Sequence, residues 1–104
     1  MVSAANPYRG EASIAVGGET LVLRPSFSAL VAAEQELGSL FELVERASEG
    51  RLCLQEIAAL FDHLSSGRAA GITRARIGEA IVEKGFAGVT PILRVVLGQI
   101  LQGQ

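Results

Sequence analysis

The periodicity of the apolar residues changes once along this chain, at Pro25. Before it, residues 9–24 alternate between apolar and polar side chains in two short runs that Gly17-Gly18 joins. Alternation with a period of two is typical of a half-buried strand, and a Gly-Gly pair between two such runs predicts a hairpin with a tight primed turn. A two-stranded hairpin is barely stable alone in water, so it has to pack on other elements. Its more buried residues are expected to be Ile14, Val16, Leu21 and Leu23.

After Pro25 the apolar residues recur at helical spacing, which predicts four or five helices over residues 26–103. Ser26 can cap the first of these helices, and Gly38 is typical of a helix end. The face expected to carry the apolar contacts of this helix consists of Phe27, Leu30, Val31 and Leu37, and it also includes Glu34.

Ser39 and Glu42 have the spacing of a capping box, in which the serine caps a helix and the glutamate reaches back to its start. The short gap after Gly38 leaves open whether this region holds two helices or one bent helix. The apolar stripe expected before Gly50 consists of Leu40, Phe41, Val44 and Ala47.

The next two helices have clearer patterns. Thr73 can cap the helix that follows it, which is the second of the two, and Gly85 can end this helix. Gly78 and Gly98 lie inside predicted helices, where glycine is about 1 kcal/mol less favourable than alanine, so we expect close helix packing at both. The apolar stripe of the first helix is Leu54, Ile57, Leu60, Phe61 and Leu64, and the shared face of the second is Ile77, Ala80, Ile81 and Lys84.

The final helix is expected to begin at Thr90-Pro91, a capping hydroxyl followed by the proline typical of a first helical position, and to end near Leu101. Its apolar residues nearly encircle it, so the helix either runs through the centre of the fold or is shared with a partner. The candidate protein-interaction residues are Ile92, Leu93, Val95, Val96, Leu97, Ile100 and Leu101.

The composition supports a folded chain, because 49% of the 104 residues are hydrophobic and 19% are charged, which excludes intrinsic disorder. We predict an α+β fold that is mostly helical, with an N-terminal β-hairpin followed by four or five helices. Residues 1–104 are expected to form a single domain, in which residues 1–8 are a flexible tail, residues 9–24 the hairpin and residues 26–103 the helical part.

No group of residues predicts an enzyme. Cys53 and His63 lie near opposite ends of one predicted helix, which separates them by about 15 Å and excludes a nucleophile and base pair. One cysteine and one histidine cannot supply the three or four ligands of a metal site, and no glycine-rich loop is followed by a phosphate-binding lysine. We therefore expect no catalytic residues, no metal, no cofactor and no small-molecule substrate.

The charge pattern leaves one alternative open. Arg68, Arg74 and Arg76 form a basic cluster that could serve a small DNA-binding regulator, but the net charge is −2. We expect no tight, salt-sensitive binding to duplex DNA. Residues 34–49 are acidic, so this acidic face and the basic arginine cluster could either support head-to-tail association or simply be solvated.

No signal peptide and no stretch of roughly 18 apolar residues is visible, so a cytoplasmic protein without membrane contact is expected.

A family resemblance rests on the first forty residues. Residues 6–11 (NPYRGE), the hairpin, residues 21–30 (LVLRPSFSAL), Glu34 and residues 37–40 (LGSL) resemble the small tail protein of gene transfer agents and siphophages. The resemblance continues through residues 54–57 and Gly67. Proteins of that family are described either as tail tube proteins or as tail assembly chaperones.

The resemblance implies a non-catalytic role in tail morphogenesis. Tail assembly chaperones bind the tape-measure protein and keep its apolar helices soluble, whereas tail tubes are built from β-barrels with large sheets. One hairpin and several helices fit the chaperone better than the tube subunit. The partners that the resemblance implies are the tape-measure protein or other tail proteins, and a homo-oligomer is a further possibility. Such a protein could also be incorporated in a phage-like particle.

Overall fold

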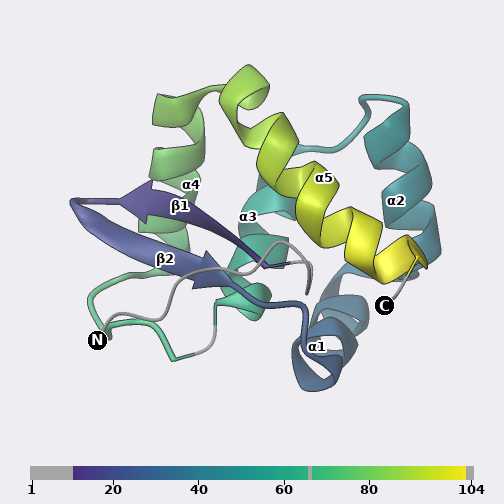
Figure 1. Cartoon of the computed structure of the whole chain (residues 1–104), viewed down its shortest axis with the longest axis horizontal. Helices are drawn as coiled ribbons and strands as arrows, with labels where there is room; N and C mark the ends of the chain where they lie inside the picture. The colour runs from purple at the N-terminus through teal and green to yellow at the C-terminus, as the bar shows by residue number, and fades with distance from the viewer. Residues whose placement is uncertain (1–10, 66, 103–104) are drawn as a thin grey trace.

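A computed structural model describes residues 11–65 and 67–102 (Figure 1). Within these residues the chain forms two strands and five helices, which confirms the mostly helical α+β fold with an N-terminal hairpin. The tail expected for residues 1–8 and the start of the hairpin at residues 9 and 10 lie outside the described residues. The elements are β1 (Ala12–Val16), β2 (Glu19–Leu23), α1 (Phe27–Leu37), α2 (Leu40–Ser48), α3 (Leu54–Leu64), α4 (Arg74–Lys84) and α5 (Phe86–Gln102).

The hairpin has the register that its Gly-Gly pair predicts. Val16 pairs with Glu19, so Gly17 and Gly18 alone form the turn, with φ of 57° and 84°. Two consecutive positive φ angles are what a primed two-residue turn requires, and glycine adopts them without strain. The inward residues of both strands are buried against helices α3, α4 and α5, as predicted: Ile14, Val16, Leu21 and Leu23.

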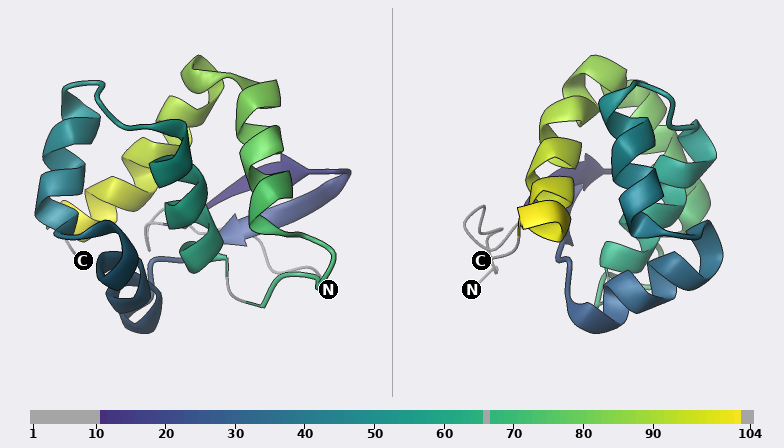
Figure 2. Two further views of the ribbon diagram at one scale, coloured as in Figure 1. Left: turned by 180° about the vertical axis from the view of Figure 1, so that it is seen from behind. Right: turned by 90° about the vertical axis from the view of Figure 1, so that its right-hand side faces the viewer.

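Helix α3 is the central helix of the fold. Seen from behind, it lies between α2 and α4, and α1 crosses near its end (Figure 2). The predicted stripe is confirmed except that Leu54 is only partly buried, and α3 also buries Ala58 and Ala59, so it is covered on nearly all sides. The pattern of the last helix left open whether that helix runs through the centre of the fold or is shared with a partner; the central position belongs to α3.

The predicted face of α1 is wrong at Phe27 and Val31, whereas Leu30 and Leu37 do pack against the core. Phe27 and Val31 are exposed, and the residues buried against α3 are Ala29 and Ala33. At about 100° per residue, Ala29 and Ala33 lie roughly 120° around the helix from the centre of the predicted face, and Leu30 and Leu37 lie between the two. Small side chains on the inward face let α1 approach α3 closely, and Leu30 and Leu37 pack at the edges of the contact.

The gap after Gly38 separates two helices. The φ of 84° at Gly38 ends α1, and the Ser39 side chain accepts a hydrogen bond from the Glu42 backbone at 3.4 Å, as a cap should. The carboxylate that reaches the start of α2 belongs to Glu34, whose Oε2 accepts from Leu40 N at 3.2 Å. The predicted stripe is wrong at Phe41, which is exposed, and it omitted Leu43, which is buried.

Helix α4 has the predicted ends, whereas α5 begins five residues before Pro91, the predicted first helical residue. Thr73 caps α4, and Gly85, with a φ of 83°, ends it. Helix α5 then begins at Phe86, and Thr90 lies inside it, with its hydroxyl donating to the Phe86 carbonyl at 2.8 Å. Pro91 removes one hydrogen bond of this helix.

The early start of α5 has a tertiary cause. Val89 is fully buried in the core, so packing holds the preceding turn in helical form despite residues with weak helix propensity.

In α4, Ile77 and Ile81 are buried as predicted, Ala80 packs at the edge of the core, and Lys84 is exposed. In the part of the chain that the structure describes, no helix has both the length and the hydrophobicity needed to cross a membrane.

Candidate protein-binding site

The seven apolar residues predicted as an interaction surface do not share one environment. Ile92, Val96 and Leu97 are buried, whereas Leu101 is 56% exposed. The other three are partly buried: Leu93, Val95 and Ile100. Helix α5 therefore has a core face, which includes Val89, Ile92 and Val96, and a second apolar face that the rest of the described chain covers incompletely.

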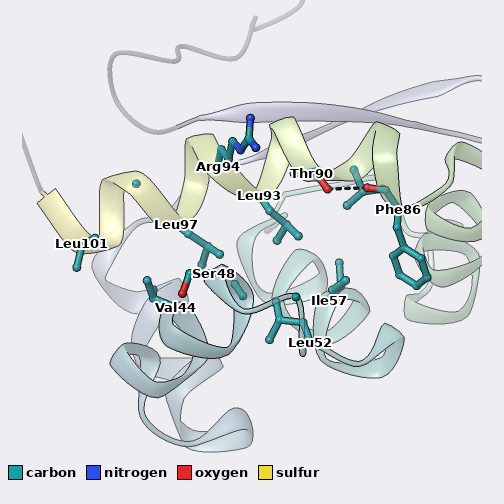
Figure 3. A pocket seen from close by; sticks show the side chains of 14 residues that line it. Val44, Ser48, Leu52, Ile57, Phe86, Thr90, Leu93, Arg94, Leu97 and Leu101 are labelled. Atoms are coloured by element: carbon teal, nitrogen blue, oxygen red, sulfur yellow. Dashed lines mark hydrogen bonds between the residues drawn. The ribbon is translucent and has the colours of Figure 1, made fainter.

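The second face of α5 forms one wall of an apolar groove, which we call the α2–α5 groove. Its volume is about 610 Å³. Figure 3 shows Leu93 and Leu97 of α5 directed into the same space as Leu52 and Ile57. The groove is lined by Val44, Ala47, Ser48, Gly50, Leu52, Ile57, Phe86, Val89, Thr90, Leu93, Arg94, Leu97, Gly98 and Leu101.

The wall that α5 contributes runs nearly the whole length of the helix. Phe86, Leu93, Leu97 and Leu101 are spaced so that they lie on one side of it. At 1.5 Å per residue, the distance from Phe86 to Leu101 along the helix axis is about 22 Å. Phe86 and Leu101 are 61% and 56% exposed, so a large apolar side chain is accessible at each end of the groove.

The polar side chains of the groove are mostly engaged within the chain. The Ser48 hydroxyl donates to the Glu45 carbonyl at 2.7 Å, and the Thr90 hydroxyl donates to the Phe86 carbonyl. Arg94 is the one charged residue in the lining, and no ion-pair partner for it is found among the described residues. A groove of this kind is suited to hold apolar side chains of another molecule.

Gly98 contradicts the prediction that both helix-interior glycines reflect close packing. At Gly78, an added Cβ would lie 3.8 Å from the Ala58 Cβ, so α3 and α4 do approach closely there. At Gly98, an added Cβ would have no heavy atom within 4 Å. Gly98 therefore faces open space in the groove, and packing within the described chain does not explain it.

Sequence reasoning found only part of this site. It selected Leu93, Leu97 and Leu101, but it missed Phe86 because it began the helix at Thr90-Pro91. It assigned Val44 and Ala47 of α2 to a core stripe, whereas both line the groove. The end of α4 at Gly85 was a signal that a new helix could start at Phe86.

The arginines of the alternative DNA-binding hypothesis are largely engaged in ion pairs. Asp62 on α3 pairs with both Arg68 and Arg74, and the Arg74 guanidinium also donates to the two carboxylate oxygens of Glu36 at 2.6 and 2.8 Å. Arg76 is exposed and donates to the Gly71 carbonyl at 3.1 Å. These contacts tie α1, α3 and α4 together, which is a structural role for two of the three arginines.

Cys53 and His63 are at opposite ends of α3, as predicted. Cys53 is the exposed residue that precedes the helix, and its backbone N–H donates to Glu56 at 2.9 Å. His63 Nε2 lies 2.7 Å from Glu36 Oε1 on α1. Over the described ranges, no three histidine, cysteine or acidic side chains are grouped so that they could hold a metal ion.

Replacing Glu36 with glutamine is expected to lower the thermal unfolding midpoint by a few degrees at neutral pH. Hydrogen bonds from Arg74 and then from His63 lower the pKa of Glu36 from 4.5 to about 2. Since the folded state binds the proton less tightly than the unfolded state, ionised Glu36 stabilises the fold above about pH 4.5, and this contribution is lost as the pH falls towards 2.

The test is to measure the midpoint for both proteins by circular dichroism across this pH range. Their difference should shrink between about pH 5 and about pH 2. Glu83→Gln, an exposed change on α4, is the matched control and should show no such convergence. A difference between wild type and Glu36→Gln that stays constant across the range would contradict the prediction.

Comparison with known families places the chain among the tail proteins of phages and gene transfer agents. It belongs to the family described as "Phage tail tube protein, GTA-gp10", which matches residues 9–103 and so includes the hairpin, all five described helices and both walls of the groove. Neither the curated proteins nor the solved structures contain a match. Membership in this family points to a role without catalysis.

Proposed function

We propose that this protein is a non-catalytic tail assembly chaperone that binds the tape-measure protein and keeps its apolar helices in solution until tube subunits polymerise. The observation that carries the proposal is the α2–α5 groove, whose α5 wall is about 22 Å long and has an exposed apolar side chain at each end. This role places the protein in the cytoplasm during assembly.

The energetic case rests on the apolar residues that the groove leaves accessible. Burying a large aliphatic or aromatic side chain completely contributes about 1.5–3 kcal/mol, and partial burial contributes correspondingly less. Phe86, Leu93 and Leu101 all retain surface that a partner could cover. A contiguous apolar surface of this kind marks an interaction site or an aggregation hazard, and a protein partner removes the hazard.

A tube component is the second candidate, and the description of the family favours it. In that case the groove would receive a neighbouring subunit of the tube. We rank it second because the described residues contain a single two-stranded sheet, which is little material for a tube built from large sheets. The DNA-binding hypothesis ranks below both, because Arg68 and Arg74 pair with acidic side chains of the same chain.

Co-expression with the tape-measure protein of the same genome tests the proposal. We expect this protein to raise the soluble fraction of the tape-measure protein and to elute with it. Leu93→Glu should weaken the complex about ten-fold or more, because a carboxylate in the apolar groove must be desolvated. The control is Val82→Glu, which places the same charge at an exposed apolar position of α4 that does not line the groove.

One outcome would contradict the chaperone role: an unchanged soluble fraction of the tape-measure protein together with recovery of this protein in assembled tubes, which would support the tube component. Equal binding of the tape-measure protein by both variants would contradict the groove as the contact and place it elsewhere on the surface.

A further inference from the structure

We infer that the α2–α5 groove receives a single amphipathic α-helix, which crosses α5 closely at Gly98 and brings a carboxylate to Arg94. The identification of that helix as a segment of the tape-measure protein rests on the proposed function. The form of the occupant is argued from the groove itself.

The lining favours a helix over an extended segment. Neither strand contributes a lining residue; most of the lining comes from helices α2, α3 and α5, whose backbone groups are largely paired within each helix, and Gly50 and Leu52 lie between α2 and α3. The hydroxyls of Ser48 and Thr90 already donate to backbone carbonyls. An extended occupant would therefore bury backbone N–H and C=O groups without partners, whereas a helix satisfies its own. Apolar helices laid into grooves of this kind use anchors at helical spacing.

Gly98 indicates where the occupant comes nearest. Glycine is unfavourable inside a helix compared with alanine, and no atom of the described chain occupies the space that a Cβ would fill. The absence of a side chain lets another backbone approach closely. Gly98 lines the groove between Leu97 and Leu101, at the edge of the face that the leucines form, so a helix crossing there contacts the exposed Leu101.

Length favours a foreign helix over a second copy of this chain. Arg94 is one turn before Gly98 and has no ion-pair partner among the described residues, so it can pair with an acidic residue at the edge of the occupant. Outside α5, the exposed large apolar residues of the described chain lie on three different helices, and the longest run of them on one helix, Phe27 and Val31 of α1, covers about one turn. The groove face of α5 spans about four turns, which one turn of a second copy would leave mostly open.

The experiment measures binding of overlapping peptides, each about 20 residues long, that cover the tape-measure protein. Fluorescence anisotropy gives the affinity, and circular dichroism reports whether a bound peptide becomes helical. We expect at least one peptide to bind as a helix. Gly98→Leu should weaken its binding about ten-fold or more, and Arg94→Glu should weaken it most at low salt, where charge pairing is least screened.

Stability separates a binding role of Gly98 from a structural one. Gly98→Ala should raise the unfolding midpoint by about 3–8 °C, since alanine is the better helix former and its Cβ meets no atom, yet it should weaken peptide binding. The matched control is Gly78→Ala, whose Cβ makes an ordinary contact with Ala58 and which should leave peptide binding unchanged.

The outcomes also separate this inference from the proposed function. A soluble complex with the full-length tape-measure protein, but no helical peptide bound or equal peptide binding by Gly98→Leu, would overturn the inference and leave the chaperone role standing. A peptide bound at Gly98 without any gain in solubility of the full-length protein would support the inference and contradict the chaperone role. A dimer of this chain that Gly98→Leu abolishes would show a second copy as the occupant, which also overturns the inference.

Discussion

Replacing Phe61 with alanine is expected to lower the free energy of unfolding by about 3–5 kcal/mol, a large part of the stability of a domain of this size. Phe61 lies in the last turn of α3 and is 0% exposed, within the core cluster that both strands and all five described helices share. Removing its ring loses the hydrophobic contribution and leaves a cavity that the surrounding helices can fill only partly. Urea denaturation followed by circular dichroism measures the loss.

Phe27→Ala is the control for the Phe61 experiment. The substitution is chemically identical, but Phe27 is 84% exposed at the start of α1, so its effect should stay within about 0.5 kcal/mol. Equal losses for the two variants would mean that Phe27 faces the core, as the sequence pattern predicted, and that the observed orientation of α1 is wrong.

Replacing Leu23 with alanine is expected to cost about 2–5 kcal/mol. Leu23 ends β2 and is fully buried, and the next residue, Arg24, donates its backbone N–H to the Leu64 carbonyl of α3 at 2.7 Å. A two-stranded hairpin is stable only when one of its faces packs on other elements. This change therefore weakens the hairpin and also the burial of the helix side chains that pack against it. Thermal and urea unfolding measure the effect.

Val22→Ala is the matched change on the opposite face of the same strand. Val22 is only partly buried, so its truncation should cost less than about 1 kcal/mol. If Leu23→Ala left the unfolding transition of the helices unchanged, the hairpin would be a detached arm and not a part of the core.

Signals confined to a few neighbouring residues predicted the local structure well. Gly17-Gly18 defined the turn, and the length of the turn fixed the register of the two strands. The register decides which side chains are buried, because a strand that shifts by one residue turns every side chain to the other face. Ser39 and Thr73 capped helices where their hydroxyls could accept a backbone N–H, and Gly38 and Gly85 ended helices through positive φ. Each of these features depends on a backbone conformation that one or two residues decide.

The rotation of a helix about its axis was predictable only where one stripe was apolar. The pattern of α3 gave its inward face correctly, because its large apolar residues follow one another at helical spacing. On α1, Phe27 and Val31 lie on a different side from Ala29 and Ala33, and the alanines are buried because they fit against α3. The hydrophobicity of Phe27 could not reveal this, since the choice depends on the shape of the neighbouring helix.

The sequence by itself determined the class of fold, the turn and register of the hairpin, and most helix ends, because hydrogen bonding and backbone conformation within a few residues specify them. Only the tertiary structure decided that α5 begins at Phe86, that its apolar residues divide between the core and the α2–α5 groove, and that Gly98 faces open space. These features depend on distances between α5 and α2, which are far apart in the chain, and on the burial of Val89. Packing between segments that are distant in the chain decides these features, so they cannot be predicted from a local pattern of residues.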